Sequence, residues 1–288
     1  MSLPPQLAAV RPRQWVKNIL VLAAPLAAGS ILQPRILGQV ALAFVAFCAV
    51  ASGIYLVNDV IDRDGDRAHP VKRLRPIASG AVSARAALVV GILLLVATPV
   101  LTALVGFRDL AMVLAVYAVI QLAYCLYLKD LAVIDLAVVS SGFLLRAIAG
   151  GAATGIHPSP FFLLVASFGS LFMVAGKRFS EVLLVGHGAS ATRRTLGAYS
   201  ASYLRFVWGM AGAVTLGFYS QWAFSLNRSH ELLPQLSIAF FSISMLRYAV
   251  DIDSGSAGEP ESIVLGDRVL QVLGALWLAT FVISGIVG

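Results

Sequence analysis

The chain has 288 residues, of which 59% are hydrophobic and only 12% are charged, and its mean hydropathy is +0.88. Soluble domains usually carry about twice that charged fraction, so the composition excludes an ordinary soluble globular protein. The net charge of +7 primarily indicates how the chain is oriented in the membrane, and secondarily an anionic ligand. We expect no nucleic-acid partner.

Apolar runs of about 20 residues recur along the whole chain, which is typical of transmembrane helices. We therefore expect an all-α, polytopic protein of the lipid bilayer, with residues 1–288 forming one domain. The basic, proline-interrupted start predicts no cleavable signal peptide. Cys48 and Cys125 fall in apolar runs, and their spacing indicates neither a disulfide framework nor a zinc site. The expected spans are 18–33, 36–57, 86–105, 109–128, 131–153, 160–176, 204–226, 233–250 and 267–287.

The basic residues are distributed unevenly between the two membrane faces. With the N-terminus in the cytoplasm, only Arg35, Arg108 and Arg228 fall outside, and Arg146 falls within a span. The other 17 of the 21 basic residues lie on the cytoplasmic side, as the positive-inside rule requires. We expect a multi-pass protein of the cell membrane with a cytoplasmic N-terminus, an external C-terminus and a cytoplasmic active face. Its long cytoplasmic connections are 58–85, 177–203 and 251–266.

Carboxylates cluster where the second apolar run ends, in the stretch NDVIDRDGD. Asp59, Asp62 and Asp66 are spaced three and four apart, so on a helix end they share one face, and Asp64 lies off it. Like charges at these spacings repel, and charge near hydrocarbon is costly. Mg²⁺ prefers carboxylate and phosphate oxygens, so these residues and Asn58 predict a Mg²⁺–diphosphate site. The alternative is a solvated loop that is neutralised by the arginines interspersed in it.

A basic segment follows the carboxylates and is stiffened by two prolines. Lys72, Arg73 and Arg75 lie within four residues, between Pro70 and Pro76. Beside a metal–carboxylate cluster these cations are expected to clamp phosphate, for which arginine offers bidentate contacts. Ordinary positive-inside charge is the alternative interpretation.

The pattern NDxxDxxxD at the end of an apolar run, followed by KRxRPIxxG, resembles the UbiA superfamily of intramembrane prenyltransferases. The resemblance covers essentially the whole chain. It implies nine transmembrane helices around a central cavity that opens toward the cytoplasmic face. It also implies that Mg²⁺ ionises an isoprenoid diphosphate, and that Asn58, Asp59, Asp62 and Asp66 form the Mg²⁺–diphosphate site.

The chain departs from this family at a second motif. Usual members carry a DxxxD motif after the sixth helix, whereas this chain has AGKRFSE there, with Lys177, Arg178 and Glu181. Two cations thus replace the expected carboxylates. This exchange suits a site that holds an additional phosphate without a bridging metal, and a positive-inside start to the loop is the alternative.

Three further segments, RPRQWVKN, GKRFSE and GEPESIVLGDRVL, resemble an actinobacterial branch of the family. That branch transfers phosphoribose from 5-phosphoribosyl-1-diphosphate to decaprenyl phosphate, a long polyprenyl phosphate, for cell-wall arabinan synthesis. The resemblance implies a sugar diphosphate as donor, a lipid phosphate as nucleophile and no general base. Two alternatives stay open: prenyl transfer to an aromatic acceptor, and a transporter. A homo-oligomer is also left open.

Several isolated polar residues are weaker candidates. Lys17 begins the first helix, where it either binds phosphate or anchors the interface. Lys129, after Tyr127, resembles a family lysine and is a candidate phosphate ligand. Asp135 lies a turn inside the fifth run and is a site candidate unless it pairs with Lys129 or Arg146. Arg146 lies deeper, where it either pairs structurally or lines the cavity.

Overall fold

The structure, a computed structural model, describes residues 3–186, 194–226, 232–258, 263–264 and 266–287. Over these ranges the chain is helical and contains no strand, which confirms the all-α prediction. The chain divides into two compact units, and the predicted single domain therefore remains a prediction. The first unit comprises Met1–Pro25, Gln33–Leu128 and Leu145–His157, and the second comprises Leu26–Leu32, Lys129–Leu144 and Pro158–Gly288.

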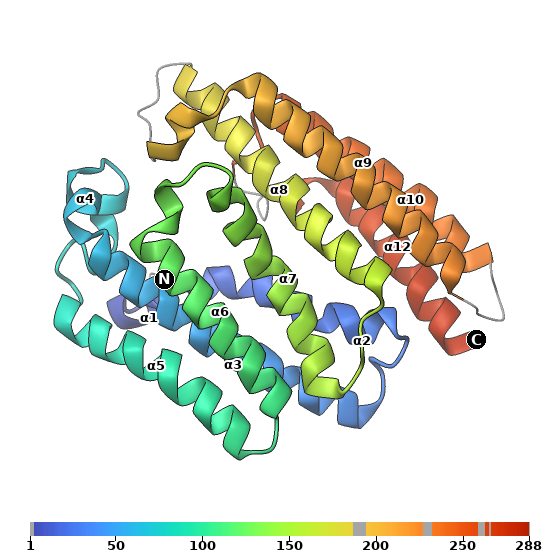
Figure 1. Cartoon of the computed structure of the whole chain (residues 1–288), viewed down its shortest axis with the longest axis horizontal. Coiled ribbons are helices and arrows are strands. Elements are labelled where there is room, and N and C mark those ends of the chain that lie inside the picture. Colours follow the sequence, from blue (N-terminus) through green and yellow to red (C-terminus); the bar gives the residue numbers. More distant parts are fainter. Residues whose placement is uncertain (1–2, 187–193, 227–231, 259–262, 265, 288) are drawn as a thin grey trace. The chain divides into compact units, whose positions relative to one another are not determined.

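Figure 1 shows the helices in chain order. Those of the first unit are α1 (Pro5–Ala9), the 3-10 helix η1 (Pro12–Leu22), α3 (Pro34–Ile61), α4 (Arg63–Ala68), η2 (Lys72–Leu74), α5 (Ala84–Leu104) and α6 (Arg108–Leu126). Two α-helices, α2 (Ala23–Ala27) and α7 (Ile134–Thr154), contribute residues to both units. The remaining elements are η3 (Leu128–Asp130), α8 (Pro160–Gly186), η4 (Arg194–Ala198), α9 (Ala201–Ser225), α10 (Leu232–Asp253) and α12 (Arg268–Val287).

Six helices in the described ranges are long and apolar enough to cross a membrane: α3, α5, α6, α7, α8 and α10. The count of nine spans stays a prediction. The first expected span, 18–33, is not one helix, because η1 ends at Leu22, α2 ends at Ala27 and Gly29 has a φ of 70°. Glycine adopts this left-handed conformation without the steric penalty that other residues meet, so the chain turns there.

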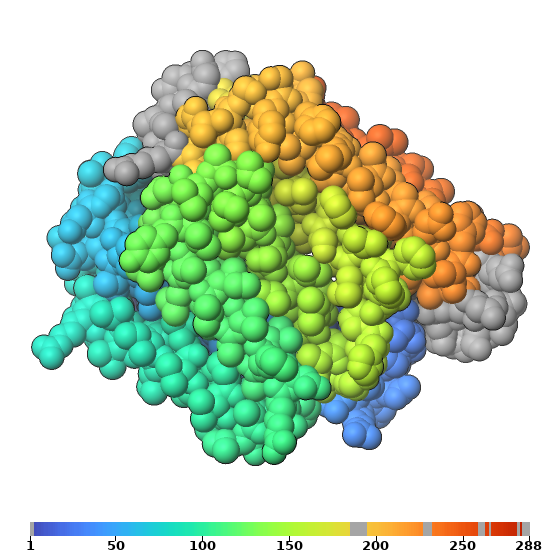
Figure 2. Space-filling view, in the orientation of Figure 1, coloured from blue at the N-terminus to red at the C-terminus, as the bar shows by residue number. Residues whose placement is uncertain are grey.

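In the first unit, α3 packs against α5 and α6. Gly53 and Gly91 allow a close approach of α3 to α5, since a Cβ on Gly53 would lie 2.9 Å from the Gly91 carbonyl oxygen. The outer side of α5 exposes apolar side chains such as Leu93 and Val96. Atoms of α5 and α6, coloured teal to green, are visible at the surface in Figure 2. An apolar outer face of this kind suits contact with lipid.

The N-terminal segment of the first unit is anchored to α3 and to α7. The Trp15 indole Nε1 donates to the Ser52 hydroxyl at 3.1 Å. A Cβ on Gly150 would lie 1.8 Å from the Val21 carbonyl oxygen, so only glycine fits at this contact with η1. These contacts fix the position of Arg11, which immediately precedes η1.

In the second unit, α8 packs along α9, and α10 packs along α12. The core includes Phe172, Phe179, Leu204 and Ile252. The N-cap of α9 is Ser200, whose hydroxyl accepts the Tyr203 N–H at 3.1 Å. Helix α8 runs ten residues beyond the expected end at residue 176, so the predicted loop at 177–203 begins as helix.

Candidate metal and phosphate sites

The carboxylate motif lies at a break between two helices of the first unit. Helix α3 ends at Ile61, and Asp62, with φ −84° and ψ 0°, joins it to α4. The Asn58 amide Nδ2 donates to the Asp62 carboxylate at 3.0 Å. The prediction that the three aspartates share one helical face assumed a continuous helix, whereas the structure divides the motif between α3 and α4.

Asp59 and Asp66 come together across this break. Both are buried, with exposed fractions of 2% and 4%. Arg75 bridges them, because its NH1 lies 3.2 Å from Asp59 Oδ1 and 2.6 Å from Asp66 Oδ2. Arg11 also forms an ion pair with Asp59. Two buried carboxylates are thus held close together by arginines that are themselves about one quarter exposed.

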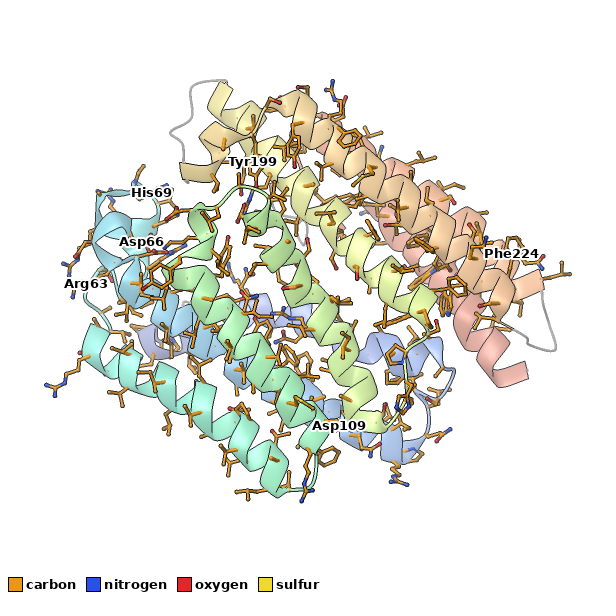
Figure 3. The ribbon with its side chains drawn as sticks, in the orientation of Figure 1. Arg63, Asp66, His69, Asp109, Tyr199 and Phe224 are labelled. Carbon is orange, nitrogen blue, oxygen red and sulfur yellow. The ribbon has the colours of Figure 1, made fainter. Side chains whose placement is uncertain are left out.

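The arginines interspersed in the motif serve the exposed acid instead. Arg63 and Arg67 lie 3.1 Å and 3.6 Å from Asp64, whose side chain is 79% exposed. Figure 3 labels Arg63 and Asp66 on α4. A loop neutralised by its own arginines therefore describes Asp64 but not the buried pair, Asp59 and Asp66.

Arg11 is a member of this cluster that reasoning from sequence missed. Its guanidinium lies 5.2 Å from the centroid of the Tyr55 ring as well as on Asp59. The backbone of Arg11 is left-handed, with φ 54° and ψ 61°. Only the segment RPRQWVKN pointed to this region, and it did not single out Arg11.

The buried pair fits Mg²⁺ by the chemistry of its oxygens. Asp59 accepts hydrogen bonds through Oδ1 and Asp66 through Oδ2, so one oxygen of each carboxylate takes none from the described residues. Mg²⁺ prefers such hard oxygens and shares its shell with phosphate and water. As placed, no three acidic, histidine or cysteine side chains in the described part of the chain are grouped closely enough to hold a metal alone. Phosphate oxygens would have to complete the shell.

The remaining basic candidates of the first unit lie around the motif in sequence. Lys72 and Arg73 are on η2, where Lys72 is half-buried and Arg73 is exposed. Lys17 is half-buried on η1. Tyr127, at the end of α6, is 73% exposed and is not part of the carboxylate cluster.

Arg146 makes polar contacts with two other helical elements of the first unit. It is 5% exposed, and its Nε donates to Asn18 Oδ1 at 2.7 Å while its NH2 donates to the Tyr117 hydroxyl at 3.0 Å. The guanidinium also lies over the rings of Phe47 and Tyr117, at 5.5 Å and 5.0 Å from their centroids. Arg146 therefore ties α7 to η1, α3 and α6 within the first unit.

The second unit contains another cluster of carboxylates and arginine. Asp135 is fully buried, and Arg178, 2% exposed, contacts it with two nitrogens at 2.8 Å and 3.1 Å. Arg178 NH1 also donates to Glu181 at 2.9 Å. This geometry favours a structural role for Arg178 over the predicted phosphate contact. Lys177 is half-buried on α8.

The turn before α7 is a second feature that sequence reasoning missed. Val133 has a φ of 68°, and its N–H donates to the Tyr199 hydroxyl at 2.7 Å. A non-glycine residue in this region costs about 1–3 kcal/mol. Lys129 lies just before this turn, half-buried on η3.

Comparison with known proteins places the chain in a family. The model of the UbiA prenyltransferase family matches residues 19–265. The chain belongs to the UbiA prenyltransferase family. The match covers both units, and with the six apolar helices it makes the chain an integral membrane protein.

Two relatives within the UbiA family are similar over nearly their full length. Decaprenyl-phosphate phosphoribosyltransferase of Mycolicibacterium smegmatis is 50% identical over 285 residues, which cover 94% of this chain and 89% of that protein. The protein of the same name from Corynebacterium glutamicum is 48% identical over 282 residues, which cover 96% and 85%.

A solved structure shows the same fold at low identity. A UbiA homologue from Archaeoglobus fulgidus, bound to DMAPP and Mg²⁺, has a TM-score of 0.74 and 18% identity, and the match covers 98% of this chain and 99% of that one. This likeness confirms the UbiA membrane fold that the aspartate motif predicted.

Proposed function

We propose that this chain transfers 5-phosphoribose from 5-phosphoribosyl-1-diphosphate to decaprenyl phosphate and releases pyrophosphate. The observation that carries the proposal is the near-full-length identity of about 50% to relatives named decaprenyl-phosphate phosphoribosyltransferase. The residues agree with it, because one aspartate motif is present and basic residues stand where a second was expected. The product would supply cell-wall arabinan synthesis.

The first unit carries the leaving-group chemistry in this proposal. Asp59 and Asp66 would hold Mg²⁺, and Asn58 and Asp62 would support them. When bound, Mg²⁺ supplies positive charge that stabilises a departing diphosphate. Arg75 keeps the two buried carboxylates together, and its remaining N–H groups are available to phosphate oxygens.

The reaction exchanges one bond at the ribose C1 for another. The bond from C1 to the diphosphate oxygen breaks, and an oxygen of the lipid phosphate forms the new bond from the opposite face. A phosphate monoester is already ionised near neutral pH, so the acceptor needs no general base. Positioning and electrostatics then carry the rate.

Further basic residues are proposed to bind the other two phosphates, the 5-phosphate of the donor and the phosphate of the lipid. Of the two adjacent basic residues on α8, Arg178 is already engaged by two carboxylates. Lys177 is therefore the stronger candidate for binding phosphate. The other candidates are Lys17, Lys72, Arg73 and Lys129. The positive-inside distribution supports a cytoplasmic active face, a cytoplasmic N-terminus and an external C-terminus.

A two-donor assay tests the proposed function. Purified protein with Mg²⁺ would receive either 5-phosphoribosyl-1-diphosphate with polyprenyl phosphate, or a prenyl diphosphate with an aromatic acceptor, and pyrophosphate release would be measured. We expect release only from the first pair. Release only from the second pair would replace the proposal with prenyl transfer.

A further inference from the structure

The backbone just before α7 has a conformation that its sequence does not favour. Val133 has a φ of 68°, which a β-branched residue rarely adopts. Its side chain is 54% exposed, so burial of that side chain does not account for the conformation. Strain of this kind persists where surrounding structure holds it, and it gathers at functional positions.

Tyr199 provides such a hold from another part of the second unit. Its hydroxyl accepts the Val133 N–H at 2.7 Å, and its ring is buried in the core of that unit. The ring stacks on that of Tyr203, with centroids 5.9 Å apart and planes inclined by 1°. Burial raises the pKa of the Tyr199 hydroxyl, which therefore stays neutral at physiological pH. A rigid ring thus places one neutral oxygen on one backbone N–H.

Candidate functional residues lie on both sides of the strained position. Lys129 precedes Val133 by four residues on η3, and Asp135 follows it by two in the first turn of α7. Asp135 is fixed by its two contacts with Arg178. The Val133 backbone therefore determines how the Lys129 segment is directed relative to the Asp135–Arg178 pair.

We propose that Tyr199 is a positioning residue that acts through the Val133 backbone. By holding Val133 left-handed, it sets the path of the chain between Lys129 and Asp135. The consequence for catalysis rests on the proposed function, in which Lys129 binds a substrate phosphate. The structural part of the proposal does not depend on that function.

The first test removes only the hydroxyl. Tyr199→Phe keeps the ring but loses the acceptor, and Tyr203→Phe is the matched control, because the Tyr203 hydroxyl makes no hydrogen bond to the described residues. We expect Tyr199→Phe to raise the apparent KM for one phosphate substrate about three- to tenfold, as for one lost hydrogen bond, with kcat changed less than about twofold. Its melting temperature should fall by about 2–4 °C. Equal effects from Tyr203→Phe would overturn the proposal.

A rescue test separates the backbone from simple packing. Glycine adopts positive φ without penalty. The double variant Tyr199→Phe/Val133→Gly should therefore have the same melting temperature and KM as the single variant Val133→Gly. Val133→Ala, which keeps most of the penalty, should not restore them. Failure of glycine to rescue, or equal rescue by alanine, would contradict the proposal. The melting readout decides this even if the wild-type protein transfers no phosphoribose, a result that would end only the proposed function.

Discussion

Each of the two units contains an arginine held by two carboxylates, and the two clusters differ in how accessible that arginine is. In the first unit, Arg75 joins Asp59 to Asp66, and its side chain is 27% exposed. In the second unit, Arg178 joins Asp135 to Glu181, and its side chain is 2% exposed. The contacts are similar in the two clusters, but a soluble ligand can reach Arg75 and cannot reach Arg178.

The difference shows how the same residue types serve chemistry or structure. Arg75 is reachable and leaves one oxygen of each aspartate without a partner among the described residues, so the cluster can exchange contacts with a metal and phosphate. Arg178 is enclosed and contacts Asp135 through two nitrogens, so breaking that pair would remove a close charge partner from a buried carboxylate. We therefore expect losses in the first cluster to act on turnover and losses in the second to act on stability.

The largest effect is expected at the first cluster. Asp59→Asn and Asp66→Asn should each lower turnover about 10²–10³-fold or more, the scale of losing a group that stabilises transition-state charge. We expect Mg²⁺ with pyrophosphate to raise the melting temperature of the wild type, and each variant should lose this rise. Asp64→Asn is the control, since Asp64 is exposed and pairs only with nearby arginines. Normal turnover in either of the first two variants would remove the metal assignment.

The next largest effect is expected in the second cluster, where the adjacent residues Arg178 and Lys177 should respond differently to substitution. Arg178→Ala should destabilise the protein by about 3–5 kcal/mol, because it removes the two guanidinium contacts of the buried Asp135 carboxylate. Lys177→Ala should change stability by only about 0.5 kcal/mol and should instead raise KM for a phosphate substrate. Thermal unfolding in detergent and steady-state kinetics measure the two effects. If Lys177→Ala were the more destabilising change, the contrast between the residues would be wrong.

The smallest effect on stability is expected for an ion pair at the surface, between Arg247 and Asp267. The hydrogen bond from Arg247, 2.7 Å long, lowers the pKa of Asp267. The pKa of Asp267 is lower in the folded protein than in the unfolded chain. The pair therefore stabilises the folded protein at pH values above the unfolded pKa of about 3.9, and this stabilisation is lost as pH falls through the folded pKa. Asp267→Asn keeps a good N-cap for α12 and removes the charge. Its slight deficit in melting temperature at pH 6 should shrink as pH falls below the unfolded pKa of about 3.9. A deficit that does not change with pH would exclude the charge as its cause.

Sequence predicted the elements that depend on local pattern. Apolar runs predicted α5 and α6 to within two residues at each end, and the spacing of acids located the Asp59–Asp66 motif. The α3–α4 break was missed, because three- and four-residue spacing assumes one continuous helix. The length of α8 was missed for a related reason, since charged residues at 177 and 178 resemble the start of a loop.

Long-range partners could not be predicted from local pattern. Arg11 lies 48 residues from Asp59, and Asp135 lies 43 residues from Arg178. The sequence offered Lys129 and Arg146 as partners for Asp135 because they are near it in the chain. Which cation reaches which carboxylate depends on helix packing, and packing is set by small features such as the Gly150 contact with Val21.

Transfer of a labelled sugar tests the central claim most directly. The protein in detergent would receive ribose-labelled 5-phosphoribosyl-1-diphosphate, decaprenyl phosphate and Mg²⁺, and label would be counted in the organic phase. We predict lipid-linked label that requires all three components and disappears in Asp59→Asn but not in Asp64→Asn. Absence of lipid-linked label from active, folded protein, together with prenyl transfer to an aromatic acceptor, would contradict it.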